Sequence, residues 1–321
     1  MKKQLFCVLL LDFILIFNGW LHAQSSNLGS QAFTVNEIKE SIFSRDTSAI
    51  QKRRLVTVLS TTSLIYAGYM SYLQFAWYKD HERVDFHFYN DLKGYNQIDK
   101  LGHVYGSYML SYIGFKSLRW GGVPPGKAAW YGGGIGFLMQ LPIEIWDGMY
   151  EGWGFSWSDV AANGLGSAMM AAQEIMFREQ IVRYKFSFSP TTYARQANGY
   201  LGTGFDQLLY DYNGHTYWLS TGLQRFFPGS KIPRWINLAA GYSAGGMFGE
   251  FENKLSHKGV LLPVTERYRQ FLFSLDIDFS KIPSRNKVLK GIFNNMFILK
   301  VPFPAIEINT KGELKFHALY Y

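Results

Sequence analysis

The residues of this sequence that are best suited to chemistry are one imidazole and three carboxylates. They are His103, Glu144, Asp147 and Asp159. An imidazole beside carboxylates suits a divalent cation, and the same groups suit general acid-base catalysis when burial separates their pKa values. A fully paired network of these groups would instead lock helices together. We rank that structural network first and assign no metal ligand, so the four residues stand as catalytic candidates only.

Three further polar residues complete the candidate cluster. They are Asp99, Lys100 and Asn163. Side chains three or four residues apart lie on one face of an α-helix, and this spacing relates Asp99 to His103, Glu144 to Asp147, and Asp159 to Asn163. We therefore predict one polar cluster shared by three helices. In a ligand-binding version, Lys100 would contact a phosphate or neutralise a carboxylate, and Asn163 would orient the ligand or a water.

Four helical segments must position these side chains. We predict them over residues 55–78, 99–118, 127–147 and 157–179. A Pro-Pro-Gly break precedes the third segment, and Ser158 or Asp159 can cap the fourth. Small residues recur four apart in the last three segments, as Gly102/Gly106, Gly132/Gly136 and Ala162/Gly166. Such pairs let helix backbones approach closely, either in a membrane bundle or in a tightly packed soluble one.

The first helical segment is also a candidate membrane span. Residues 55–78 contain no charged side chain, and about 20 apolar residues cross a bilayer. Their Thr, Ser, Gly and Gln content fits a buried bundle helix equally well. The basic residues before position 55 would lie in the cytoplasm by the positive-inside rule, whereas a cleaved export signal would place them outside.

The N-terminus carries the features of a secretory signal. Lys2 and Lys3 precede an apolar stretch, and a Leu-His-Ala sequence ends at Ala23. We predict a signal peptide over 1–23, with an uncleaved anchor helix as the alternative, and a polar arm over 24–54. The single cysteine, Cys7, lies in the apolar stretch, so the mature chain would have no disulfide, no thiolate nucleophile and no lipidation site.

The periodicity changes at about residue 183. Alternating or aromatic-rich segments follow, separated by Gly, Asn and Pro breaks, at 184–189, 217–223, 235–242, 271–279, 305–309 and 314–321. The fold class is therefore α+β, with a hydrophobic helical domain over 55–182 and an antiparallel β-rich region over 183–321. That region would form a partial sheet or a small barrel.

Composition restricts the partners of the chain. Only 17% of the residues are charged and 48% are hydrophobic, whereas soluble domains carry about 25% charged residues. This indicates membrane contact or a β-rich envelope protein. The formal net charge is +8, but the basic residues are dispersed along the chain. Such dispersion suits an anionic lipid or glycan surface better than a nucleic-acid groove, so we expect no nucleic-acid partner.

The order and spacing of the polar residues resemble a known family. The motifs are Asp99-Lys100-x-x-His103, Glu144-x-x-Asp147, and Phe155-Ser156-x-x-Asp159-x-x-x-Asn163-x-x-Gly166. They resemble the YfiM-like predicted periplasmic lipoproteins, a domain family of unknown function, and more distantly the VanZ-like membrane proteins linked to glycopeptide tolerance. The resemblance implies a location in the cell envelope and no particular reaction. The chain departs from the family by lacking a lipidation cysteine and by its β-rich extension.

The sequence thus predicts an exported, membrane-associated envelope protein on the periplasmic or outer-membrane side. We expect a structural or accessory role without enzymatic activity, and membrane lipid or envelope components as partners. Two alternatives stay open. The cluster could bind or process a lipid or glycan headgroup, with His103 as the base and Glu144 or Asp147 as the acid, or the chain could be an outer-membrane β-protein with a helical domain. The sequence identifies no cofactor and no protein partner.

Overall fold

A computed structural model describes residues 50–321, and it confirms the α+β fold class. The predicted signal peptide and nearly all of the polar arm lie outside the described residues. The described chain divides into two compact units. The helical unit contains residues 50–91 and 103–181, and the sheet unit contains residues 92–102 and 182–321. The division falls within one helix, between Gly102 and His103.

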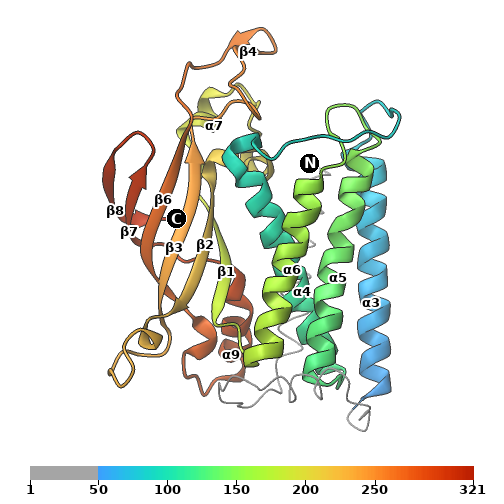
Figure 1. Ribbon diagram of the computed structural model, residues 1–321, viewed down its shortest axis with the longest axis vertical. Coiled ribbons are helices and arrows are strands. Elements are labelled where there is room, and N and C mark those ends of the chain that lie inside the picture. The colour runs from blue at the N-terminus through green and yellow to red at the C-terminus, as the bar shows by residue number, and fades with distance from the viewer. Residues whose placement is uncertain (1–49) are drawn as a thin grey trace. The chain divides into compact units, whose positions relative to one another are not determined.

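The helical unit is built from the four predicted helices, which run alongside one another (Figure 1). They are α3 (Lys52–Tyr72), α4 (Ile98–Trp120), α5 (Pro125–Asp147) and α6 (Trp157–Phe177), and α3 continues as the π-helix η2 (Leu73–Trp77). Proline near the first turn of α5 fits its start, because a helix needs no amide donor there. None of the described helices combines the length and the apolar character that crossing a membrane requires. The candidate span over 55–78 falls short because hydroxyl and amide side chains lower its hydropathy.

Glycine sets the distance between the helices of this unit. A Cβ atom built on Gly136 of α5 would lie 2.6 Å from both the Ser107 carbonyl oxygen and the Ser111 amide nitrogen of α4. A Cβ on Gly166 of α6 would lie 2.9 Å from the Val104 carbonyl carbon, and closer to its oxygen. Such separations are too short for a side chain, so α5 and α6 both lie against the backbone of α4 only because these positions are glycine. This agrees with the close approach predicted from the spacing of small residues.

The sheet unit contains a six-stranded antiparallel sheet in the order β1-β2-β3-β6-β7-β8. The strands are β1 (Val182–Phe188), β2 (His215–Gly222), β3 (Ile236–Gly245), β6 (Tyr268–Ile277), β7 (Phe303–Asn309) and β8 (Leu314–Tyr320). Each overlaps one of the segments predicted from alternation. A small hairpin pairs β4 (Ser256–His257) with β5 (Val260–Leu261).

Short helices occupy the connections. They are α7 (Thr192–Gln196), α8 (Gln207–Tyr210), α9 (Lys287–Asn295), and the 3-10 turns η3 (Gly94–Gln97), η4 (Gly204–Asp206), η5 (Tyr212–Gly214), η6 (Leu223–Arg225), η7 (Phe279–Lys281) and η8 (Met296–Ile298).

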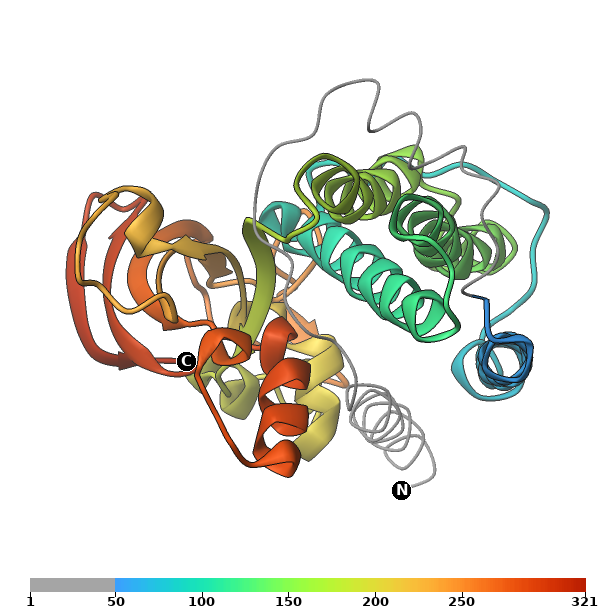
Figure 2. The ribbon, with the colours of Figure 1, turned by 90° about the horizontal axis from the view of Figure 1, so that it is seen from below.

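The sheet is strongly curved. The Trp218 ring on β2 lies 5.9 Å from the Tyr320 ring on β8, and the Thr216 and Tyr320 hydroxyls are 3.2 Å apart. Three strands separate β2 from β8, and in a flat sheet that separation would be about 19 Å at roughly 4.8 Å per strand. The sheet therefore wraps around a concave face, as Figure 2 shows.

The two faces of the sheet have the reverse of the usual polarity. The concave face buries polar and charged groups, including the Lys185–Asp276 ion pair (Nζ to Oδ2, 2.7 Å), whose side chains are 1% and 0% exposed. Burial lowers the pKa of Lys185 in spite of its partner, and it lowers that of Lys300 to about 8. The convex face instead exposes large apolar side chains, which are Leu219, Leu238, Phe271, Phe273, Leu275, Ile306, Ile308, Leu314 and Phe316. We call these nine the convex apolar face.

Candidate functional site

His103 lies at the centre of a polar cluster within the helical unit. It projects from α4, and its Nδ1 atom is 3.3 Å from the Glu144 Oε1 atom on α5. Its Nε2 atom is 3.6 Å from the Asp159 Oδ1 atom on α6. The imidazole therefore bridges three helices through two carboxylates.

Asn163 closes the network on the Nδ1 side of the ring. Its Oδ1 atom lies 3.2 Å from His103 Nδ1, and its Nδ2 atom donates to Glu144 Oε1 at 3.5 Å. Both ring nitrogens thus face oxygen acceptors. The imidazolium form can donate from both nitrogens, whereas the neutral ring can donate from only one.

The cluster lies largely away from solvent. The Glu144 and Asp159 side chains are 1% and 5% exposed, and the His103 side chain is 17% exposed. Moving a carboxylate out of water costs several kcal/mol unless a partner charge and hydrogen bonds compensate. The His103 ring lies between the two carboxylates and, as an imidazolium, would supply that compensation for both.

Local sequence explains why Asp159 and Asn163 reach the ring. Ser156 is the N-cap of α6, and its side-chain oxygen accepts a hydrogen bond from the Asp159 amide. This corrects the prediction that Ser158 or Asp159 would cap the helix, since a cap residue accepts from an amide two or three positions later. Ser156 and Ser158 both donate to Asp91 Oδ1, at 2.6 and 2.7 Å. Residues 155–159 of the motif therefore fix where α6 begins.

Asp147 makes a hydrogen bond at the end of α5. It ends α5 one turn after Glu144, and it accepts a hydrogen bond from the Tyr78 hydroxyl at the end of η2. Burial, and then the charge of Asp147, raise the pKa of Tyr78. The Tyr78 ring also stacks on Tyr150 with centroids 4.5 Å apart. Asp147 therefore ties the end of α5 to the chain that follows α3.

Asp99 and Lys100 lie in the first turn of α4 and belong to the sheet unit. Lys100 Nζ is 3.0 Å from Asp99 Oδ2, and the Tyr212 hydroxyl donates to Asp99 Oδ1 at 2.9 Å. Burial, and then the Asp99 charge, raise the pKa of Tyr212 well above its usual value. Lys100 therefore neutralises a carboxylate, which is one of the two uses expected for it.

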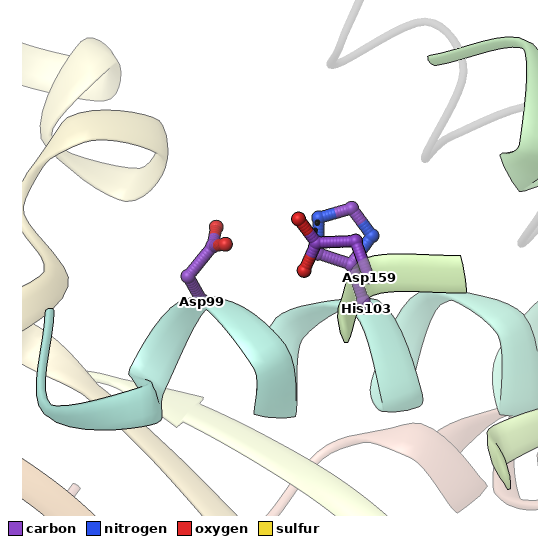
Figure 3. A group of neighbouring side chains, drawn as sticks. All are labelled: Asp99, His103 and Asp159. Atoms are coloured by element: carbon purple, nitrogen blue, oxygen red, sulfur yellow. Dashed lines mark ion pairs between the residues drawn. The ribbon is translucent and has the colours of Figure 1, made fainter. Parts of the chain in front are cut away.

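The donor set around His103 could also hold a metal ion. Asp99 lies one helical turn before His103 on α4, and Figure 3 shows both with Asp159. Within the helical unit, His103 and Asp159 each offer one ligand atom, and these two atoms lie within 4.8 Å of each other. An imidazole nitrogen and a carboxylate oxygen are ligand types that suit zinc or manganese.

His215 is a buried titratable residue that the candidate cluster did not include. It begins β2, its Nε2 atom is 2.9 Å from the Leu208 carbonyl oxygen, and its Nδ1 atom is 3.2 Å from the Tyr217 hydroxyl. Burial lowers the pKa of His215 to about 4. A neutral ring that donates to Leu208 and accepts from Tyr217 fits both contacts. No chemical motif in the sequence marks this residue, because its partners come from its own aromatic surroundings.

We expect His215 to make the fold less stable in acid. Its pKa is about 4 in the folded chain and 6.5 ordinarily, so between these values the unfolded chain takes up a proton that the folded chain does not. Its stabilising effect is complete above about pH 6.5 and decreases by about 3 kcal/mol as the pH falls to 4. The variant H215Q should lose this slope in urea denaturation measured from pH 7 to 4, whereas H257Q should keep it. Equal slopes for H215Q and the wild type would contradict the assignment.

Comparison with protein families identifies one match. Residues 87–174 match the family described as predicted periplasmic lipoprotein (DUF2279), over a little more than a quarter of the chain. The matched stretch contains every residue of the motifs that suggested this resemblance, so the resemblance is confirmed there. The match supports an exported protein of the cell envelope. No curated protein and no solved structure matches the chain.

Proposed function

We propose that this chain, which matches the predicted periplasmic lipoprotein family over residues 87–174, is a structural or accessory component of the cell envelope. In this proposal the His103 network has no catalytic role. It holds α4, α5 and α6 in one fixed arrangement. The observation that carries the proposal is that both nitrogens of one imidazole face buried carboxylates from two other helices.

The burial of the cluster favours a structural network that holds the helices together, which we call the lock, rather than a ligand-binding site. A residue that binds or processes a headgroup must reach its ligand, whereas Glu144 keeps only 1% of its side chain exposed. The His103 ring already contacts Glu144, Asp159 and Asn163. The same helices meet at Gly136 and Gly166, so the network lies where the backbones are already in contact.

A neutral version of the network tests the proposal. The triple variant H103Q/E144Q/D159N removes all three ionisable groups but keeps side chains of similar size and hydrogen-bonding capacity. We expect it to accumulate in the envelope and to restore envelope integrity under detergent and osmotic stress to a strain that lacks the gene. A triple variant that accumulates normally but does not restore integrity would overturn the lock and assign the charges to a ligand or a reaction.

A second variant covers the case in which the amide version does not fold. In H103L/E144M/D159L the network becomes apolar, and buried ion networks replaced in this way often keep or gain stability. It also removes the imidazole and both carboxylates of the network as donors for a metal or a headgroup. Restoration of envelope integrity by this variant would support the lock, and normal accumulation without restoration would contradict it.

A further inference from the structure

We infer that one end of the sheet unit binds the surface of an anionic phospholipid bilayer. Two connections form this end, residues 223–235 between β2 and β3 and residues 278–302 between β6 and β7. They lie together because the start of β3 pairs with the ends of both β2 and β6, as in the pairs Gly222–Asn237 and Ile236–Ile277. Figure 1 shows both at the lower end of the sheet. We call residues 223–235 and 278–302 the basic end.

The basic end is rich in positive charge, and its one acidic residue, Asp278, is only 2% exposed. Its basic residues are Arg225, Lys231, Arg234, Lys281, Arg285, Lys287, Lys290 and Lys300. Lys281 contacts Asp278 at 3.7 Å, and Lys300 is buried over the Trp218 ring. The other six are exposed. Each basic residue near an anionic membrane surface adds favourable binding free energy.

The opposite end of the sheet provides the contrast. Residues 246–267 connect β3 to β6 there, and acidic and basic residues are balanced among them, with Glu250, Glu252 and Glu266 against Lys254, Lys258 and Arg267. This end also exposes apolar side chains, including Leu255 and Leu261. The two ends therefore differ in charge more than in apolar exposure, and only the basic end complements an anionic surface.

Apolar side chains stand among the charges of the basic end. On α9, Val288, Leu289 and Ile292 are 71%, 43% and 51% exposed, beside Lys287 and Lys290. A short helix that presents aliphatic and lysine side chains together fits the boundary between headgroups and acyl chains.

Aromatic side chains complete the basic end. On the neighbouring connection, Phe226 and Phe227 are more than half exposed. Phe293 holds α9 to the unit, with its ring 5.6 Å from that of Phe279. Val288 stays 71% exposed on the same helix, so part of α9 remains available to a membrane surface.

The convex apolar face supports lipid over a protein partner. Its side chains form rows across the strands, such as Phe273, Ile306 and Phe316, which pair in register. Protein interfaces carry about one hydrogen bond per 100–200 Å² and are enriched in Tyr, Trp and Arg. Exposed Leu, Ile and Phe predominate on this side of the sheet, which also carries Tyr242 and Arg269. Strands that contact lipid place apolar side chains outward and polar side chains inward.

Vesicle flotation of the full chain tests the inference. We expect binding to vesicles of phosphatidylcholine with 30% phosphatidylglycerol, weaker binding to phosphatidylcholine alone, and a decline as salt is raised. The charge reversal K287E/K290E should weaken binding to the anionic vesicles by roughly 25-fold or more, at about fivefold per lysine. The matched reversal K254E/K258E at the opposite end should change it little. Equal effects of the two reversals would overturn the inference.

A second measurement locates the contact even if another part of the chain also binds lipid. In a C7S background, V288C and L261C each place one fluorophore, on α9 and on the opposite end respectively. Brominated acyl chains should quench the label at position 288 and leave the label at 261 unchanged. Quenching at 261 alone, or at neither position in bound protein, would contradict membrane contact through the basic end.

Discussion

The variant H103A is expected to lose about 3–5 kcal/mol of unfolding free energy, the usual cost of removing one partner from a buried ion network. The change leaves the Glu144 and Asp159 carboxylates, both at least 95% buried, without the ring that lies between them. Their mutual repulsion and the cost of their burial then act together. Urea denaturation at neutral pH measures the loss. The comparison requires that the unfolding free energy of the wild type and of the variant depend equally on urea concentration.

A double variant separates this network effect from simple loss of packing. Adding E144Q to H103A removes one of the two facing charges, so the pair should lose less stability than the sum of the single changes. D147N is the matched control. Asp147 lies three residues further along α5 and contacts Tyr78 instead, so its effect should add to that of H103A. A loss below about 1 kcal/mol for H103A, the size expected for a surface pair, would contradict a buried network.

The second large effect is expected at Gly136. In G136A the new Cβ atom would lie 2.6 Å from two backbone atoms of α4. Neither atom can move without the helix, so α4 and α5 must separate, and such overpacking costs typically 1–3 kcal/mol.

The same helix carries the control for this prediction. G134A lies two residues away on α5, where a Cβ would meet nothing within 4 Å, and it should stabilise the fold by about 0.5–1 kcal/mol because alanine favours helix. Thermal denaturation of both variants gives opposite signs if the helix contact is as described. Two variants that shift the melting temperature in the same direction would contradict it.

The sequence determined the elements of this fold and the composition of its cluster. Apolar spacing and break residues located the helices, and alternation located the strands, because both depend on residues near one another in the chain. The three-four spacing of polar residues also identified His103, Glu144, Asp159 and Asn163, which the structure brings together. These signals are local, so they could be recognised without knowledge of the fold.

Only the tertiary structure decided which side chains meet. Asp147 shares a helix face with Glu144, but its hydrogen bond from Tyr78, more than sixty residues earlier, does not follow from that spacing. Alternation predicted the strands but not which face is buried, since that depends on curvature that brings Trp218 to Tyr320. The basic residues looked dispersed in the sequence because they belong to two connections that lie far apart along the chain. Antiparallel pairing places both connections at one end of the sheet, and no spacing within either one reveals that.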